Sequence, residues 1–167
     1  MIHFSTKDIT IIALTVALIV ICGWVIYLIS NLIPIPGFKF IGVTIFASFM
    51  IYFPVYKVQH AGVYLGTTAI FAGIMSFISL LMGLAIILTG IMTELLAWLF
   101  LKNYNSWRTI LITGCFSFLG TFNSLIITYY LTEVPILNLQ EMLIPALLFV
   151  ISSLLGGCLG AYLAHYI

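Results

Sequence analysis

Glu94 is the one acidic residue set deep in a long apolar stretch, and it is the first candidate for chemistry. No charged side chain lies between His60 and Glu94, and the next one, Lys102, follows eight residues later. Ionisable residues inside membrane segments mark ion or proton pathways, or they are held by polar partners in the protein interior. Because an ionised carboxylate in hydrocarbon is costly, we expect Glu94 to be protonated or hydrogen-bonded inside the fold. The partners we expect are Thr93, a tyrosine or a neighbouring helix.

A second group of candidates combines aromatic rings with amides and a carboxylate near the ends of apolar runs. Pockets for small molecules are mostly apolar and contain a few polar groups that orient the ligand. The group therefore predicts a pocket for a flat, polar organic molecule, although Trp and Tyr also gather at membrane interfaces without binding anything. Its members are Trp24, Tyr27, Asn31, Asn123, Tyr129, Glu133 and Asn138.

The segment that follows the first apolar run has the composition of a stiff loop. Pro34 and Pro36 restrict the backbone, and Gly37 permits a turn. With Lys39 behind them, these residues predict a loop that gates a binding site.

Metal, redox and hydrolytic chemistry find little support in the sequence. His3, His60 and His165 have no ligand-like spacing, and the three cysteines form no C-x-x-C pair. Neither H-E-x-x-H, G-x-S-x-G nor a nucleotide-binding phosphate loop is present. We therefore expect no metal site, no catalytic residues, no cofactor and no enzymatic activity.

The elements that must position these residues follow from composition. The chain has 167 residues, of which 64% are apolar or aromatic and 5% charged, and its mean hydropathy is +1.32. Soluble domains carry about 25% charged residues, and a spanning helix needs about 20 apolar ones. The sequence predicts an all-α integral membrane protein, a compact bundle of six transmembrane helices forming one domain over residues 1–167. We place the spans at about residues 9–32, 40–56, 61–78, 81–101, 107–130 and 142–167, with the turn between the third and fourth near Ser76–Ser79.

The basic residues predict the orientation of these spans. Lys and Arg accumulate on the cytoplasmic side of membrane proteins. With both termini cytoplasmic, Lys7, Lys57, Lys102 and Arg108 lie inside, and only Lys39 lies outside. The gating loop and the ends carrying Trp24 and Asn123 then face outward. We expect a multi-pass protein of a bacterial or archaeal cytoplasmic membrane.

Two features near the N-terminus and one later in the chain carry a resemblance to a known family. A polar start, Ser5-Thr6-Lys7-Asp8, leads directly into a helix that contains Ala13-Leu14-Thr15-Val16-Ala17, an A-x-x-x-A motif. A long apolar run from Leu88 to Leu101 ends in Lys102-Asn103-Tyr104. Together with the size and the scarcity of loops, this pattern resembles the substrate-binding S component of energy-coupling factor (ECF) transporters, over essentially the whole chain.

The resemblance implies a function and a set of partners. An S component captures a vitamin-like micronutrient outside, and a membrane-embedded T component with two cytoplasmic ATPases powers its uptake. Ala13 and Ala17 would contact the T component, and Pro34 to Lys39 would resemble the gating loop. His3 is not followed by the residues typical of cobalt or nickel S components, which favours a small organic substrate. The alternative is an autonomous ion- or proton-coupled carrier or channel that uses Glu94.

Overall fold

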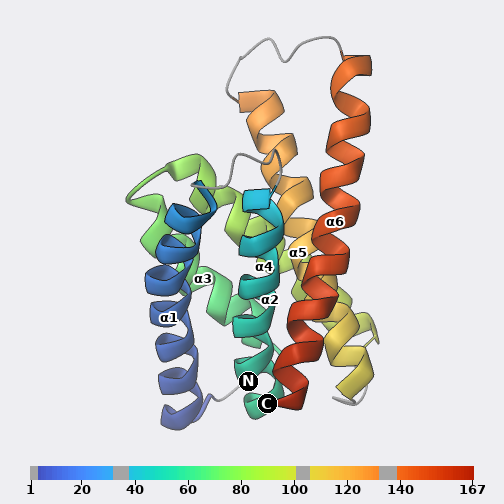
Figure 1. Ribbon diagram of the computed structural model, residues 1–167. Coiled ribbons are helices and arrows are strands. Elements are labelled where there is room, and N and C mark those ends of the chain that lie inside the picture. Colours follow the sequence, from blue (N-terminus) through green and yellow to red (C-terminus); the bar gives the residue numbers. More distant parts are fainter. Residues whose placement is uncertain (1–3, 32–37, 101–105, 132–138) are drawn as a thin grey trace.

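Helices make up the regular structure of this chain. The computed structural model describes residues 4–31, 38–100, 106–131 and 139–167, and every regular element among them is an α-helix (Figure 1). The helices are α1 (Thr6–Asn31), α2 (Phe38–Val58), α3 (Val63–Ser76), α4 (Leu80–Phe100), α5 (Ser106–Leu131) and α6 (Leu139–Tyr166). The expected all-α class is confirmed. The short turn between α3 and α4 lies where the sequence predicted it.

Four of the helices are long and apolar enough to cross a membrane. These stretches are Thr6–Ile26, Leu80–Phe100, Trp107–Ile127 and Leu147–Tyr166. The described apolar stretches of α2 and α3 are shorter, Gly42–Val58 and Val63–Ser76. With 14 residues, α3 is about 21 Å long, less than the hydrocarbon thickness of about 30 Å. The structure thus indicates a membrane protein, with α3 shorter than the span expected from the sequence.

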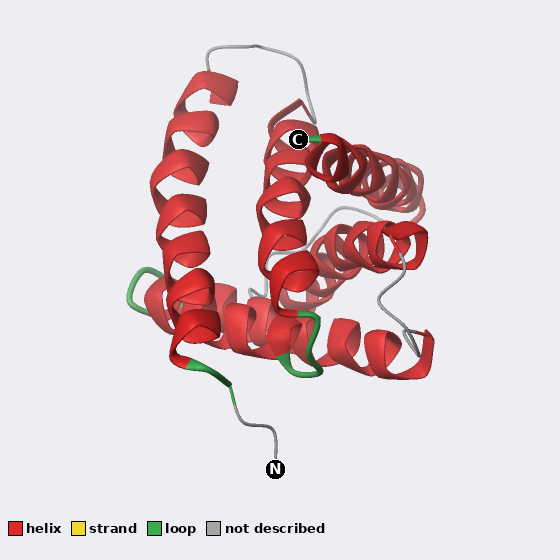
Figure 2. Ribbon diagram, turned by 90° about the horizontal axis from the view of Figure 1, so that it is seen from below, coloured by secondary structure: helices red, strands yellow, loops and turns green. Residues whose placement is uncertain are grey.

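In the described part of the chain, α2 is the helix that packs against the largest number of other helices. α2 packs against α1, α3, α5 and α6, and α5 connects α6 with α4. Among the described residues, α1 contacts only α2 and α3. In Figure 2, α1 and α2 run side by side, whereas α3 and α4 cross them at a large angle.

The C-terminal end of α6 lies at one end of the molecule, which we call the terminal end (Figure 1). The first turns of α1 and α5 and the last turn of α2 also lie there, and they carry Lys7, Arg108 and Lys57. The opposite end, here the far end, holds the turn between α3 and α4 and the last turns of α1 and α5.

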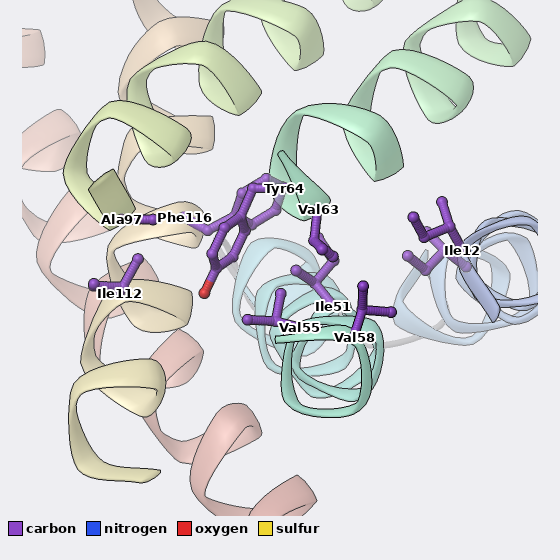
Figure 3. Close-up of a cluster of buried hydrophobic side chains, with 10 residues drawn as sticks. Ile12, Ile51, Val55, Val58, Val63, Tyr64, Ala97, Ile112 and Phe116 are labelled. Atoms are coloured by element: carbon purple, nitrogen blue, oxygen red, sulfur yellow. The ribbon is translucent and has the colours of Figure 1, made fainter. Parts of the chain in front are cut away.

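The main hydrophobic core joins five helices toward the terminal end. It is centred on Tyr64 of α3, which is 2% exposed and whose ring reaches toward α2 and α5 (Figure 3). The Tyr64 hydroxyl lies 2.9 Å from Thr113 Oγ1 of α5. The other core residues are Ile12, Ile19, Ile51, Val55, Val58, Val63, Ala97, Ile112 and Phe116.

Small residues allow the closest helix crossings. A Cβ on Gly160 of α6 would overlap the carbonyl oxygen of Ile45 in α2, and one on Gly114 of α5 would overlap Cys158 of α6. Within a membrane, such backbone approach replaces the hydrophobic effect as a source of helix association. Gly160 is therefore used for packing inside the molecule.

Buried hydroxyl groups supply the polar contacts between helices. Ser48 of α2 lies within hydrogen-bond distance of Ser117 of α5, and the Ser48 hydroxyl also donates to the Thr113 carbonyl. Several threonines, including Thr67 and Thr93, donate to the carbonyl four residues earlier in their own helix. No buried polar side-chain atom in the described part of the chain lacks a partner. The bundle interior is therefore polar in places but fully hydrogen-bonded there.

Candidate functional site

A cavity of about 450 Å³ opens at the far end between α3, α4 and α5. Its volume lies in the range of pockets that hold small molecules, about 300–1,000 Å³. Three hydroxyl groups line it, those of Ser79, Thr89 and Ser124. The remaining described lining consists of Phe71, Leu81, Met82, Ala85, Ile86, Phe116, Gly120 and Ile127. We call it the far-end cavity.

The far-end cavity exists because the sequence places small or short side chains at its floor. Gly120 of α5 faces Thr89 of α4, and a Cβ on Gly120 would lie 3.6 Å from Thr89 Cγ2, in ordinary contact. A larger side chain at position 120 would extend further toward α4. Phe71 and Phe116 contribute aromatic walls from α3 and α5. The described lining offers hydroxyl groups and apolar surface without an ionisable group.

Thr89 lines this cavity and is hydrogen-bonded to Asn123, one of the binding residues predicted from the sequence. Its hydroxyl donates to the Ala85 carbonyl at 2.7 Å and accepts from Asn123 Nδ2 at 3.1 Å. A hydroxyl has one proton and two lone pairs, so these two contacts leave one acceptor position of Thr89 unused. The Asn123 amide also donates to Met92 Sδ at 3.6 Å. Asn123 is 6% exposed, and its hydrogen bond to Thr89 fixes that hydroxyl relative to α5.

The structure brings few of the other predicted binding residues to this cavity. Trp24 lies on α1 with 53% of its surface exposed, and α1 contacts neither α4 nor α5 in the described part of the chain. The placement of Trp24 in a site thus rests on the sequence alone. Tyr27, Asn31 and Tyr129 belong to α1 and α5, but their side chains lie outside the described residues.

The predicted gating loop also falls outside what the structure describes. Pro34, Pro36 and Gly37 lie outside the described residues, as do Glu133 and Asn138. Lys39 belongs to the first turn of α2, without a described side chain. The roles of all these residues remain predictions.

Glu94 has a clear structural role. Its Oε1 accepts from the backbone N–H of Gly62 at 2.5 Å, and its Oε2 accepts from the N–H of Leu65 at 3.2 Å. Gly62 is the N-cap of α3 and offers no capping side chain. Helix N-termini leave N–H groups unpaired and favour negative charge. Glu94 is thus hydrogen-bonded at a partly exposed position, and its partner is the start of a neighbouring helix, one of the partners expected from the sequence.

Glu94 takes the place of a capping box for α3, although it belongs to the neighbouring helix α4. In a capping box, two side chains of one helix satisfy the N-cap and N3 N–H groups. Here one carboxylate from α4 satisfies both. Both oxygens of Glu94 are engaged with α3, which supports a structural rather than an ion-coupling interpretation.

The small-residue motif on α1 faces away from the bundle. Ala13 and Ala17 are exposed, whereas Ile12 and Val16, which turn toward the bundle, are 4% and 1% exposed. The motif is therefore available to a partner helix and is not used in internal packing.

The described residues gather no group of three His, Cys, Asp or Glu side chains that would hold a metal ion. Cys22, Cys115 and Cys158 are free thiols.

The cavity residues that sequence analysis missed lie on α3, α4 and α5 and in the turn before α4. Thr89 and Gly120 are separated by 31 positions, and nothing in the local sequence shows that they meet across two helices. The usable signal was the run of small and hydroxyl residues Thr89, Gly90 and Thr93, which marks an interior face of α4.

Comparison with known proteins gives no assignment. The chain matches no family model, no curated protein and no solved structure.

Proposed function

We propose that this protein is the substrate-capture component of an ECF-type transporter, which binds a vitamin-like micronutrient for uptake powered by partner subunits. In this proposal the chain crosses the membrane six times, with the terminal end in the cytoplasm and the far end outside. The location of Lys7, Lys57 and Arg108 at the terminal end supports that orientation, because cytoplasmic ends are rich in basic residues.

The observation that carries the proposal is the far-end cavity. It opens at the end that the proposal places outside, and it combines aromatic and aliphatic walls with the Thr89 and Ser124 hydroxyls. Such a lining suits an uncharged or weakly polar organic molecule with one or two hydrogen-bonding groups. Asn123 acts as a positioning residue for Thr89.

Two further observations support the transporter interpretation over an autonomous carrier. The exposed Ala13 and Ala17 leave a flat face on α1 for a partner helix, as docking on a T component requires. Glu94, the residue on which ion coupling would depend, caps α3 instead. We propose a membrane-embedded T component and two cytoplasmic ATPases as partners and no enzymatic activity for the chain itself.

The test replaces two glycines by leucine, one that lines the far-end cavity and one that faces open space. Gly120→Leu fills the far-end cavity, whereas Gly73→Leu on α3 enters open space, because nothing lies within 4 Å of a Cβ there. Each tagged protein is purified from its native membrane and denatured, and the released small molecules are identified by mass spectrometry.

We expect wild type and Gly73→Leu to release the same organic molecule and Gly120→Leu to release none. Folding of Gly120→Leu is checked by its elution volume and helix content. A folded Gly120→Leu that still carries the molecule would exclude the far-end cavity as the binding site.

A further inference from the structure

A second hollow lies at the opposite end of the same helix pair. It is a groove of about 480 Å³ between the last turns of α4 and the first turns of α5, at the terminal end. It shares no described lining residue with the far-end cavity. Its lining is Leu96, Leu99, Phe100, Arg108, Leu111, Ile112 and Cys115, and we call it the terminal-end groove.

The terminal-end groove is apolar with a single cation at its mouth. Arg108 lies in the first turn of α5, and Cys115 lies seven residues deeper, about 10 Å along the helix. The Arg108 side chain is exposed, and no ion pair joins it to a carboxylate among the described residues. The groove therefore runs from a positive charge at the helix ends into the hydrophobic zone of the bundle.

The surroundings of the groove resemble a membrane interface. Trp98 of α4 and Trp107 of α5 are 73% and 65% exposed. Exposed tryptophans on membrane proteins concentrate at the level of the lipid headgroups. Arg108 follows Trp107 directly, so its guanidinium is placed at the depth of lipid phosphates.

We propose that the terminal-end groove binds an anionic phospholipid. One acyl chain lies along Leu96, Leu99 and Ile112, and the phosphate accepts hydrogen bonds from Arg108. A guanidinium matches phosphate oxygens with paired N–H donors, and basic pockets between transmembrane helices recognise anionic headgroups. A water-soluble phosphate would satisfy Arg108 but leave the apolar walls uncovered. The proposal does not depend on the substrate bound at the far end.

The experiment uses tryptophan fluorescence, because bromine atoms on a lipid chain quench nearby indole rings. The full chain carries Trp24→Phe, so that the signal comes from Trp98 and Trp107. It is placed in phosphatidylcholine nanodiscs in which a rising fraction of lipid is replaced by brominated phosphatidylglycerol or brominated phosphatidylcholine. We expect half-maximal quenching at a phosphatidylglycerol fraction several-fold below that of phosphatidylcholine.

Four variants separate a specific site in the groove from general surface charge. Arg108→Gln should reduce the preference for phosphatidylglycerol to about one, and Arg108→Lys should leave an intermediate preference. Lys57→Gln removes a cation from the terminal end without touching the groove and should leave the preference unchanged. Cys115→Phe should weaken quenching by both lipids, because it fills the inner part of the groove.

Several outcomes would overturn the proposal. One is an equal response to both lipids in the protein with native Arg108. Another is a preference that survives in Arg108→Gln or falls equally in Lys57→Gln. Displacement of the brominated lipid by inorganic phosphate would assign the groove to a free anion instead.

Discussion

At the scale of single residues, Glu94 and Asn123 are polar side chains that form hydrogen bonds between helices. Glu94 joins α4 to the start of α3, and Asn123 joins α5 to Thr89 of α4. The sequence singles out Glu94 as an acid inside an apolar run and Asn123 as a polar member of the predicted binding group. It could not name their partners, which lie 32 and 34 positions away.

The capping role of Glu94 gives a stability prediction. Glu94→Gln keeps one acceptor oxygen and loses the charge that favours a helix N-terminus, and Glu94→Ala loses both hydrogen bonds. Loss of an N-cap costs about 0.5–2 kcal/mol, so we expect Glu94→Ala to lower the unfolding free energy by about that amount and Glu94→Gln by less. Denaturation in detergent followed by circular dichroism measures both.

The same measurement on Asp8→Asn provides the comparison. Asp8 accepts from the Ser5 N–H at 2.9 Å at the exposed start of α1, so its loss should be milder. Equal stability of wild type and Glu94→Ala would contradict the capping role.

Asn123 leads to a prediction about affinity. Asn123→Ala removes the donor that holds the Thr89 hydroxyl and should weaken binding of the released ligand by about 1–3 kcal/mol. Calorimetric titration of purified protein measures the change. Ser152→Ala on α6, where the hydroxyl bonds only within its own helix, serves as the control. An unaltered affinity in Asn123→Ala would remove this residue from the site.

At the scale of helices, composition and the gaps between apolar runs predicted most of what the structure describes. The all-α class and the turn between α3 and α4 follow from unbroken hydrophobicity and from the length that one span can have. The shortness of α3 was not predictable, because Ala61 and Gly62 continue the apolar pattern while Gly62 adopts a left-handed conformation with φ of 94°. The far-end cavity was also not predictable from the sequence, because it depends on how three helices cross.

The helix crossings give a prediction of their own. Gly160→Ala would force α6 away from the Ile45 carbonyl of α2, so we expect a loss of about 1–3 kcal/mol or more in unfolding free energy. Gly73→Ala enters open space on α3 and removes a residue with poor helix propensity, so stability should be unchanged or rise by up to about 1 kcal/mol. Thermal unfolding of the two variants in the same detergent makes the comparison. The internal role of Gly160 would be refuted by equal melting temperatures.

At the scale of the whole molecule, the cavity, the basic residues and the exposed small residues lie in three different places. The far end holds the cavity, the terminal end holds the basic residues, and α1 presents its small-residue face on the periphery. Because α1 contacts only α2 and α3 among the described residues, a change on its outer face should not reach the cavity.

This separation predicts the behaviour of docking variants. Ala13→Trp and Ala17→Trp should abolish copurification of the T component and leave the bound small molecule in place. Leu159→Trp, a matched change at an exposed position of α6, should leave the complex intact. Copurification that persists in both alanine variants would show that partners use another face.

Purification of the tagged chain from its native membrane, with identification of what accompanies it, tests whether the chain is a substrate-capture component. We expect a membrane-embedded T component, two ATPases and a small organic molecule released on denaturation. Recovery of the chain alone, together with ion-driven uptake by the purified protein in liposomes that contain no ATPase, would contradict it.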